Sequence, residues 1–242
     1  MTARQLALPF GTEPDYAAVD FIPAASNAAA RIWLARPAGW SFGRLVLCGP
    51  PGSGKTHLLH LWCAQTRAAL WSGPALRGLP PLPDGPVALD DADLAEEIAL
   101  FHLINAAGQA SRPLLLAARE PPARWTTRVP DLASRLRAST IAVIGPAEDS
   151  LLAAVLARLL AERQLAVPLA LQTWLLTRLP RHSAALAEAV ARLDRASLDR
   201  VSLARGRPIT RTFATSVLAE MIPERPEDEI FVTPSPLARD FL

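Results

Sequence analysis

Residues 44–56 read RLVLCGPPGSGKT, and this stretch decides the fold. Its first five residues are a short apolar run that predicts a buried strand, and residues 56–65 have helical spacing. Between them, residues 49–56 fit G-x-x-x-x-G-K-[ST] at every position, in the strand–loop–helix order that the motif requires. Glycines let such a loop curl until its amides face a phosphate, and the helix N-terminus adds positive potential. The stretch therefore predicts a phosphate-binding loop.

The motif predicts a role for each part of the loop. Pro51, Gly52, Ser53 and Gly54 form the backbone cradle, Lys55 reaches the β- and γ-phosphates, and the Thr56 hydroxyl ligates Mg²⁺. Lys55 is the only lysine beside 24 arginines. A chain that uses arginine everywhere else indicates that this position needs a compact ammonium instead of a planar fork. The alternative is a glycine-rich turn that binds no ligand.

Two acids follow a second apolar run, Val-Ala-Leu, which ends in Asp90 and Asp91 thirty-five residues after Lys55. An aspartate at the end of a strand beside a phosphate loop can hold Mg²⁺ through water, and the next acid can polarise an attacking water. We therefore predict that Asp90 helps to hold Mg²⁺ and that Asp91 polarises the attacking water. Solvated turn acids are the alternative.

The rest of the chain alternates strands and helices before it becomes wholly helical. Strands at 44–48, 68–71, 87–89, 114–118 and 141–144, with helices at 26–36, 56–65 and 94–110 and a short helix or turn at 130–137, predict a parallel sheet with crossover helices. Ser26 or Asn27 is the expected N-cap of the first helix. Helical patterns at 148–164, 168–178, 183–197 and 210–221 predict a second unit. We expect a tail at 1–15, an α/β domain at 16–148, a helical domain at 149–222 and a loose tail at 223–242.

Composition excludes several classes of protein. The chain has 242 residues, of which 50% are hydrophobic and 20% charged, and its formal net charge is +2. That balance is globular and makes no strong electrostatic case for nucleic acid or a membrane surface. No signal peptide and no apolar run of membrane-spanning length is present, so we expect a cytoplasmic protein. Cys48 and Cys63 are expected to be reduced, buried thiols, without a metal cluster.

The ordered set of motifs resembles one family. GKTHLLH at 54–60, the two aspartates and the helical unit resemble the AAA+ clade of the bacterial replication initiator DnaA. DFIPAASN at 20–27, PDLASRLR at 130–137 and LDRAS at 193–197 are similar to segments of its shorter relative, the Hda regulator. The resemblance covers about residues 5–221. It implies a five-stranded parallel sheet with a small helical lid, an entry to the adenine pocket that includes Ile22 and Pro23, and His57 as a further nucleotide-binding residue.

The N-terminal stretch QLALPF at 5–10 is similar to the peptide by which Hda-type proteins hold the replicative sliding clamp. Gln5 would enter a polar slot, Leu8 and Phe10 an apolar pocket beside Leu6, and Pro9 would restrict the chain and lower its ordering cost. Without the resemblance, this stretch is an ordinary frayed end.

The resemblance also implies a mechanism and a partner. Arg135 matches the arginine finger, which would act across a subunit boundary on ATP held by DnaA and return the initiator to its ADP form. Such an arginine is worth ~10³-fold or more in rate. The alternative for Arg135 is a surface salt bridge. We expect neither the initiator's helix-turn-helix DNA reader nor a membrane partner, and a homodimer is possible. The arginines at 192, 195, 200, 205, 207 and 211 are expected to form a solvated lid face, and a DNA-binding surface is the alternative.

Two polar groups of the family are missing. Ala117 and Ala118 stand where a residue that orients water is usual, and Ala184 stands where a phosphate-sensing arginine is usual; Arg181, one helical turn earlier, is its expected substitute. Since methyl groups cannot hydrogen-bond water, we predict that ADP or ATP binds with Mg²⁺ and with weak or absent self-hydrolysis. A DnaA-like or DnaC-like loader without clamp binding and, more remotely, a small-molecule kinase are the alternative functions.

Overall fold

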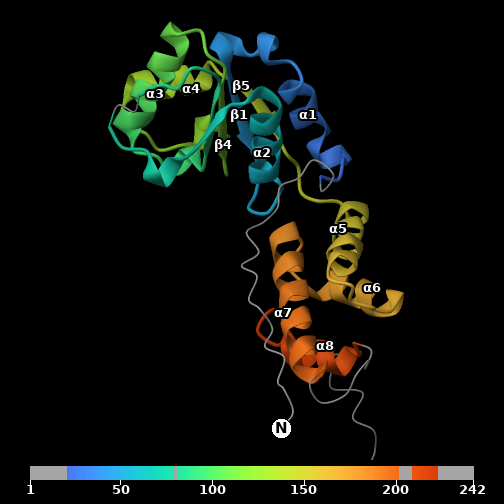
Figure 1. The fold of residues 1–242 in the computed structure, drawn as a ribbon. Coiled ribbons are helices and arrows are strands. Elements are labelled where there is room, and N and C mark those ends of the chain that lie inside the picture. The colour runs from blue at the N-terminus through green and yellow to red at the C-terminus, as the bar shows by residue number, and fades with distance from the viewer. Residues whose placement is uncertain (1–20, 79–80, 202–208, 223–242) are drawn as a thin grey trace, which may run out of the picture. The chain divides into compact units, whose positions relative to one another are not determined.

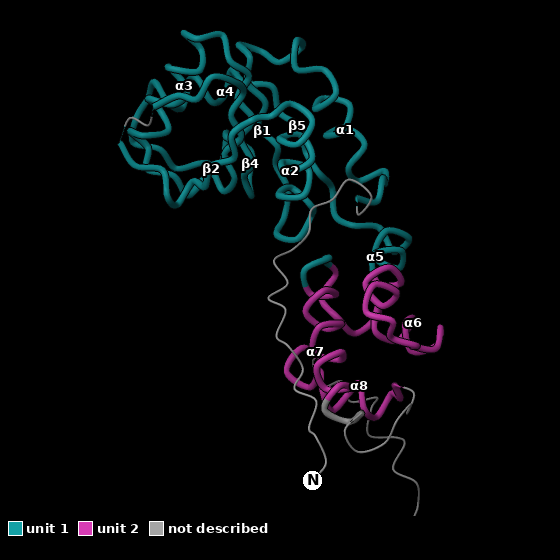
Figure 2. Tube along the Cα trace, in the orientation of Figure 1, with its two compact units in different colours: residues 1–155, 182–184 teal, residues 156–181, 185–242 magenta. Residues whose placement is uncertain are grey.

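A computed structural model of the chain describes residues 21–78, 81–201 and 209–222. Its internal contacts divide the chain into two compact units (Figure 2). The first, called here the α/β unit, comprises residues 1–155 and 182–184, and the second, the helical unit, comprises residues 156–181 and 185–242. The predicted clamp segment at 5–10 and the predicted tail at 223–242 lie outside the described residues.

The α/β unit is built on five parallel strands in the order β2-β3-β4-β1-β5 (Figure 1). The strands are β1 (Arg44–Cys48), β2 (Ala69–Ser72), β3 (Val87–Asp90), β4 (Leu114–Ala118) and β5 (Thr140–Val143). β1 and β4 are buried along their whole length. This explains why their sequences are continuous apolar runs without alternation, as is typical of a parallel sheet covered on both faces.

Successive residues of the strands pack into two separate cores. Val46 and Leu116 point to the core shared with α3 (Glu97–Gln109) and α4 (Pro130–Arg137). Leu47 and Leu115 point to the core shared with α1 (Ala25–Leu34) and α2 (Lys55–Thr66). This alternation is the two-residue period of a strand. The result is a three-layer unit with a pair of helices on each face of the sheet (Figure 1).

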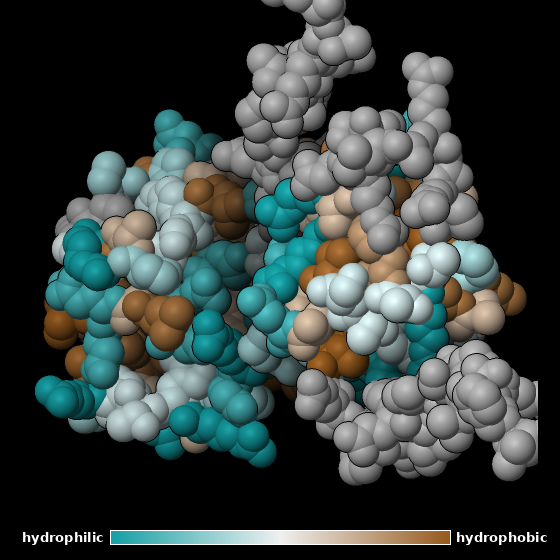
Figure 3. All heavy atoms as spheres, turned by 90° about the horizontal axis from the view of Figure 1, so that it is seen from below, coloured by the Kyte–Doolittle hydropathy of each residue, from teal (hydrophilic) through white to brown (hydrophobic). Residues whose placement is uncertain are grey.

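The helical unit is built from amphipathic helices. They are α5 (Asp149–Glu162), which begins in the α/β unit, α6 (Leu169–Arg178), α7 (Ser183–Val201) and α8 (Arg211–Val217). Leu156, Leu175, Leu186 and Leu193 are among its fully covered leucines. On the face of the molecule drawn in Figure 3, hydrophobic side chains stand in separate patches among hydrophilic ones, the ordinary texture of a protein surface.

The predicted fold class is confirmed, and local differences have physical reasons. The helix expected at 94–110 is a short turn at Ala92–Leu94 followed by α3, because Ala95 between them is extended (φ −73°, ψ 153°). α1 begins at Ala25, and neither Ser26 nor Asn27 is its N-cap. Asn27 caps the helix from inside instead, because its side-chain oxygen accepts the Ala24 amide at 3.1 Å. Within the described residues, no helix is both long and apolar enough to cross a membrane.

Candidate functional site

The loop at 49–56 joins the carboxyl end of β1 to the first turn of α2. Gly54 is the N-cap of α2 with φ 93° and ψ 14°, and Gly52 also has a positive φ of 71°. An L side chain rarely adopts these angles, so the two glycines let the chain turn sharply into the helix. The helix therefore begins at Lys55 with its unpaired amides directed back toward the loop, an arrangement suited to a phosphate.

The Lys55 ammonium lies inside the loop. It donates to the Gly49 carbonyl at 2.7 Å and to the Pro50 carbonyl at 3.0 Å, and the residue is only 8% exposed. Burial lowers the pKa of Lys55, and the negative charges of Asp90 and Asp91 oppose that shift. An ammonium partly stripped of water and held by two neutral oxygens gains strongly from an anion, because charge-assisted hydrogen bonds are the stronger kind.

The predicted metal-binding pair is in contact. The Thr56 hydroxyl donates to Asp90 Oδ2 at 2.7 Å, and the Asp91 amide donates to Asp90 Oδ1 at 3.0 Å. One hydroxyl and one carboxylate, with the remaining positions left to water and phosphate oxygens, is the set of protein ligands that Mg²⁺ takes in nucleotide sites. Among the described residues, no group of three or more His, Cys, Asp or Glu side chains could hold a metal by itself. The donors therefore fit a metal that arrives with phosphate.

Two features of this edge were not predicted. Gly73, which follows β2, packs so closely on the turn after β3 that a Cβ there would collide with the Asp91 carbonyl oxygen. Asp91 itself has a positive φ of 48°. Asp93 accepts the Arg119 amide on Oδ2 at 3.2 Å, while its buried Oδ1 has no hydrogen-bond partner among the described residues. The third acid of the run DDAD is the sequence signal that could have drawn attention to Asp93.

The two alanines at the end of β4 lie where the sequence predicts a missing polar group. Ala117 and Ala118 are fully buried and pair with Leu47 and Cys48 at the end of β1. The Ala118 carbonyl accepts the amide of Gly49, the first residue of the loop, at 3.3 Å. Their methyl groups offer no hydrogen bond to a water molecule at this edge.

The segment before α1 reaches the start of α2. The Phe21 ring meets the His57 ring edge to face, with centroids 5.3 Å apart. The Asn27 side chain donates to the Ile22 carbonyl at 3.1 Å and thereby fixes the backbone next to Pro23. Glu148 accepts the Ser26 amide at 2.7 Å. Ile22 and Pro23, which are predicted for the adenine pocket, and His57, which is predicted to bind the nucleotide, therefore belong to one connected region beside the phosphate loop.

No protein-family model matches the chain. Among solved structures, domain III of the Thermotoga maritima replication initiation protein DnaA superposes with a TM-score of 0.69 at 16% identity, over 87% of this chain and 98% of that one. AMPPCP-bound DnaA from Aquifex aeolicus superposes with a TM-score of 0.58 at 18% identity, over 78% of this chain and 71% of that one. The Thermotoga maritima RuvB Holliday junction branch migration motor superposes with a TM-score of 0.59 at 19% identity, over 81% of this chain and 66% of that one.

The chain has the AAA+ fold. At these identities the likeness concerns the fold alone.

Arg135 lies at the opposite edge of the AAA+ sheet from the phosphate loop. It belongs to the last turn of α4, which leads into the start of β5, whereas the loop follows the end of the neighbouring parallel strand β1. Strands of four or five residues separate the two edges by roughly 15 Å, at ~3.3 Å per residue. The length of the strands therefore separates Arg135 from the phosphate loop of its own chain, and its action on a nucleotide stays a prediction.

Arg181 falls in the helical unit, whereas the phosphate loop falls in the α/β unit. Its role toward a nucleotide stays a prediction.

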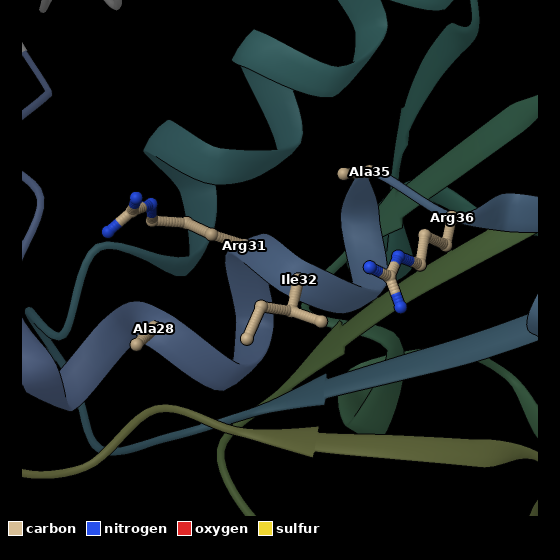
Figure 4. A pocket seen from close by; sticks show the side chains of 5 residues that line it. All are labelled: Ala28, Arg31, Ile32, Ala35 and Arg36. Carbon is tan, nitrogen blue, oxygen red and sulfur yellow. The ribbon is translucent and has the colours of Figure 1, made fainter.

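A hollow of about 470 Å³ lies on the outer side of α1 in the AAA+ core, lined by Ala28, Arg31, Ile32, Ala35 and Arg36. Figure 4 shows Ile32 between the side chains of Arg31 and Arg36. The lining includes no acid and no nucleophile, so it offers no chemistry that competes with the phosphate loop as the functional site.

Proposed function

We propose that this chain binds an adenine nucleotide with Mg²⁺ and regulates replication initiation by stimulating hydrolysis of ATP held by a DnaA initiator. The observation that supports it most is the division of the site between two edges of one sheet. The edge with Lys55, Thr56 and Asp90 has the groups that hold a nucleotide, and the other edge presents Arg135 outward. A protein with both can bind its own nucleotide and act on another.

The nucleotide bound by this chain would have a structural role. The contact of Thr56 with Asp90 orders the metal-binding side of the loop, while Ala117 and Ala118 leave an attacking water without a hydrogen-bonding side chain from β4. We therefore expect slow self-hydrolysis, with ADP or ATP held as part of the folded molecule. In the same proposal, the segment at 5–10 holds the sliding clamp and brings Arg135 to the initiator.

The proposed function is tested in a mixed assay with ATP-loaded initiator, DNA-loaded clamp and this protein. Arg135→Ala should reduce the stimulated hydrolysis at least a hundredfold, because an arginine in trans is worth ~10³-fold or more. Arg137→Ala is the matched control, since Arg137 lies two residues away on α4 and bonds only the Ala133 carbonyl of its own helix among the described residues. Equal hydrolysis with wild type and Arg135→Ala would refute the assignment.

Clamp binding is tested separately by pull-down. Leu8→Ala and Phe10→Ala should each abolish retention on an immobilised clamp while nucleotide binding is unchanged. Full retention of both variants would remove residues 5–10 from the mechanism and favour a loader that recruits its partner by another surface.

A further inference from the structure

A second hollow lies at the edge of the sheet where the strands begin. Its volume is about 400 Å³, and three short segments line it: the turn before β1, the end of α3 with the residues after it, and the last turn of α4. Its charged side chains are Arg44, Arg112 and Arg135, and no acid lines it; the other lining residues are Phe42, Gly43, Ala107, Gly108 and Ser111.

Arg44 is the unusual member, because it is a buried cation. It is only 5% exposed, and it donates through Nε to the Ser139 hydroxyl at 3.2 Å and through Nη2 to the Arg135 carbonyl at 3.3 Å. Both acceptors are neutral, and no described carboxylate forms an ion pair with Arg44. Burial lowers its pKa, and the positive charge of Arg135 lowers it further. A guanidinium taken out of water beside another cation is unfavourable until an anion joins it.

Two hydrogen bonds fix the backbone of Arg135, while its guanidinium forms no ion pair with a described carboxylate. Its carbonyl accepts both the Arg44 guanidinium and the Ser139 hydroxyl, the latter at 3.0 Å. Its guanidinium lies over the Phe101 ring, 5.5 Å from the centroid, and no described carboxylate pairs with it. The backbone bond from Arg44 therefore ties the two guanidinium-bearing residues together at one end of the hollow.

The remaining lining residues differ from this pair. Arg112 already has partners, because it donates to the Asp84 carboxylate at 2.9 Å and to the carbonyls of Leu82 and Pro83. Phe42 is 73% exposed, has a positive φ of 53°, and lies under the Arg44 guanidinium at 5.4 Å. The unmatched charge thus belongs to Arg44 and Arg135, and the nearby ring leaves one side of the Arg44 guanidinium poorly hydrated.

We infer that this hollow is an anion site that takes a phosphate group between the guanidinium groups of Arg44 and Arg135. Planar guanidinium forks match the tetrahedral oxygens of phosphate, and two of them can share one dianion. Arg44 would then bind the anion directly, in addition to supporting the last turn of α4 through its hydrogen bond to the Arg135 carbonyl. The phosphate could come from a free polyphosphate or from the terminal phosphate of a nucleotide held by another subunit. Only the second source rests on the proposed function.

The first arm of the test uses this chain alone. In a Lys55→Ala background, which removes the ammonium of the phosphate loop, pyrophosphate is titrated at constant ionic strength and binding is followed by calorimetry. The Nε–H signal of Arg44 is recorded in parallel, since a buried guanidinium bonded to Ser139 exchanges slowly with water. Added Arg44→Met should weaken binding at least tenfold, and Arg137→Met should leave it unchanged.

The second arm uses the mixed assay with ATP-loaded initiator. A tenfold or greater loss of stimulated hydrolysis in Arg44→Met, without pyrophosphate binding in the first arm, supports the site and assigns the phosphate to the partner's nucleotide. Pyrophosphate binding that depends on Arg44, together with full hydrolysis in Arg135→Ala, supports the anion site and refutes the proposed function.

The inference is overturned if Arg44→Met changes neither the pyrophosphate affinity in the first arm nor the stimulated ATP hydrolysis in the second. Should Arg44→Met fail to fold, the unsubstituted side chain still decides the question. An Arg44 Nε–H signal that moves neither with pyrophosphate nor with the ATP-loaded initiator overturns it equally.

Discussion

Asp90 accepts from two neighbours at once, the Thr56 hydroxyl on one carboxylate oxygen and the Asp91 amide on the other. This places a single residue between the predicted phosphate loop and the turn that carries the second acid. The pair of bonds also fixes the rotamer of Asp90, so its charge faces Thr56 before any metal arrives.

Asp90→Asn should weaken Mg²⁺-dependent nucleotide binding by about tenfold or more. The amide keeps the size of the side chain but removes the charge, and hydrogen bonds to charged groups are worth about 1.5–3 kcal/mol. The comparison is calorimetric titration of ADP with and without Mg²⁺, with exposed Asp131→Asn as control. A variant whose affinity still rises fully with Mg²⁺ would exclude Asp90 as a ligand.

The two thiols should be unreactive in the folded protein. Burial raises the pKa of Cys48 to about 12 and that of Cys63 to about 11. Since the thiolate is the reactive form, alkylation by iodoacetamide at pH 8 should be far slower than in denaturant. Both pKa values are raised, so the folded state retains protons that the unfolded chain loses. The free energy of unfolding should therefore fall as the pH rises through 9 toward 11. Rapid alkylation of the native protein at pH 8 would contradict this.

Residues of the phosphate loop could be predicted singly because the motif fixes both their type and their spacing. The contacts of Arg44 and of Gly73 could not be predicted from the sequence. Arg44 lies in an apolar run, and only the folded chain shows that the hydroxyl of Ser139 and the backbone of Arg135 meet it. Gly73 looks like part of a loop rich in proline and glycine, and its close approach to Asp91 comes from the pairing of β2 with β3.

Among the elements, α1 connects the segment at 21–23, which is predicted to line the adenine pocket, to the rest of the fold. Asn27 both accepts the Ala24 amide and donates to the Ile22 carbonyl, and Glu148, which directly precedes α5 in the same unit, accepts the amide of the neighbouring Ser26. The orientation of the segment at 21–23 thus depends on side chains inside the helix that follows it.

Asn27→Ala should destabilise the protein by about 1–2 kcal/mol, the usual effect of losing a helix cap together with a buried hydrogen bond. It should also weaken ADP binding, because the Ile22 backbone loses its anchor. Chemical denaturation measures the first effect and calorimetry the second. Ala29→Ser, on an exposed position of the same helix, is the control. Normal ADP affinity in a destabilised Asn27→Ala protein would separate α1 from the adenine side.

The strands and helices were predictable because continuous apolar runs and helical periodicity act locally. The errors occur where one side chain or one backbone angle decides a boundary. Helix α3 starts later than its periodicity predicts because Ala95 is extended, and α1 starts earlier because a polar side chain on its third residue does the capping. Periodicity describes which face is buried, not where the first hydrogen bond forms.

For the whole molecule, nucleotide binding and stability are linked. At a free ADP concentration of 100 times Kd, binding adds about 2.7 kcal/mol to the free energy of unfolding. For a chain of this size that corresponds to a rise in Tm of about 5–10 °C. Lys55→Ala should show little or none of this shift. Thermal unfolding with and without ADP measures it, and an equal shift in the variant would show that ADP binds elsewhere.

The division of the AAA+ core into two functional edges follows from topology and could be predicted once the strands were assigned as parallel. A loop after β1 and a helix that leads into β5 must lie at opposite ends of neighbouring strands. The hollow with Arg44 was not predictable. It requires the turn before β1, the end of α3 and the end of α4 to meet, and these are far apart in the sequence.

Because Lys55 is buried in the predicted phosphate loop, its chemical modification should report whether a nucleotide occupies the loop. The chain has a single lysine, which is buried and whose amine donates to the carbonyls of Gly49 and Pro50. Amine-directed acylating reagents have one internal target, so the yield of acyl-Lys55 in a peptide mass map should drop when ADP fills the loop. A yield that ADP does not change would mean that the ammonium does not contact the bound nucleotide.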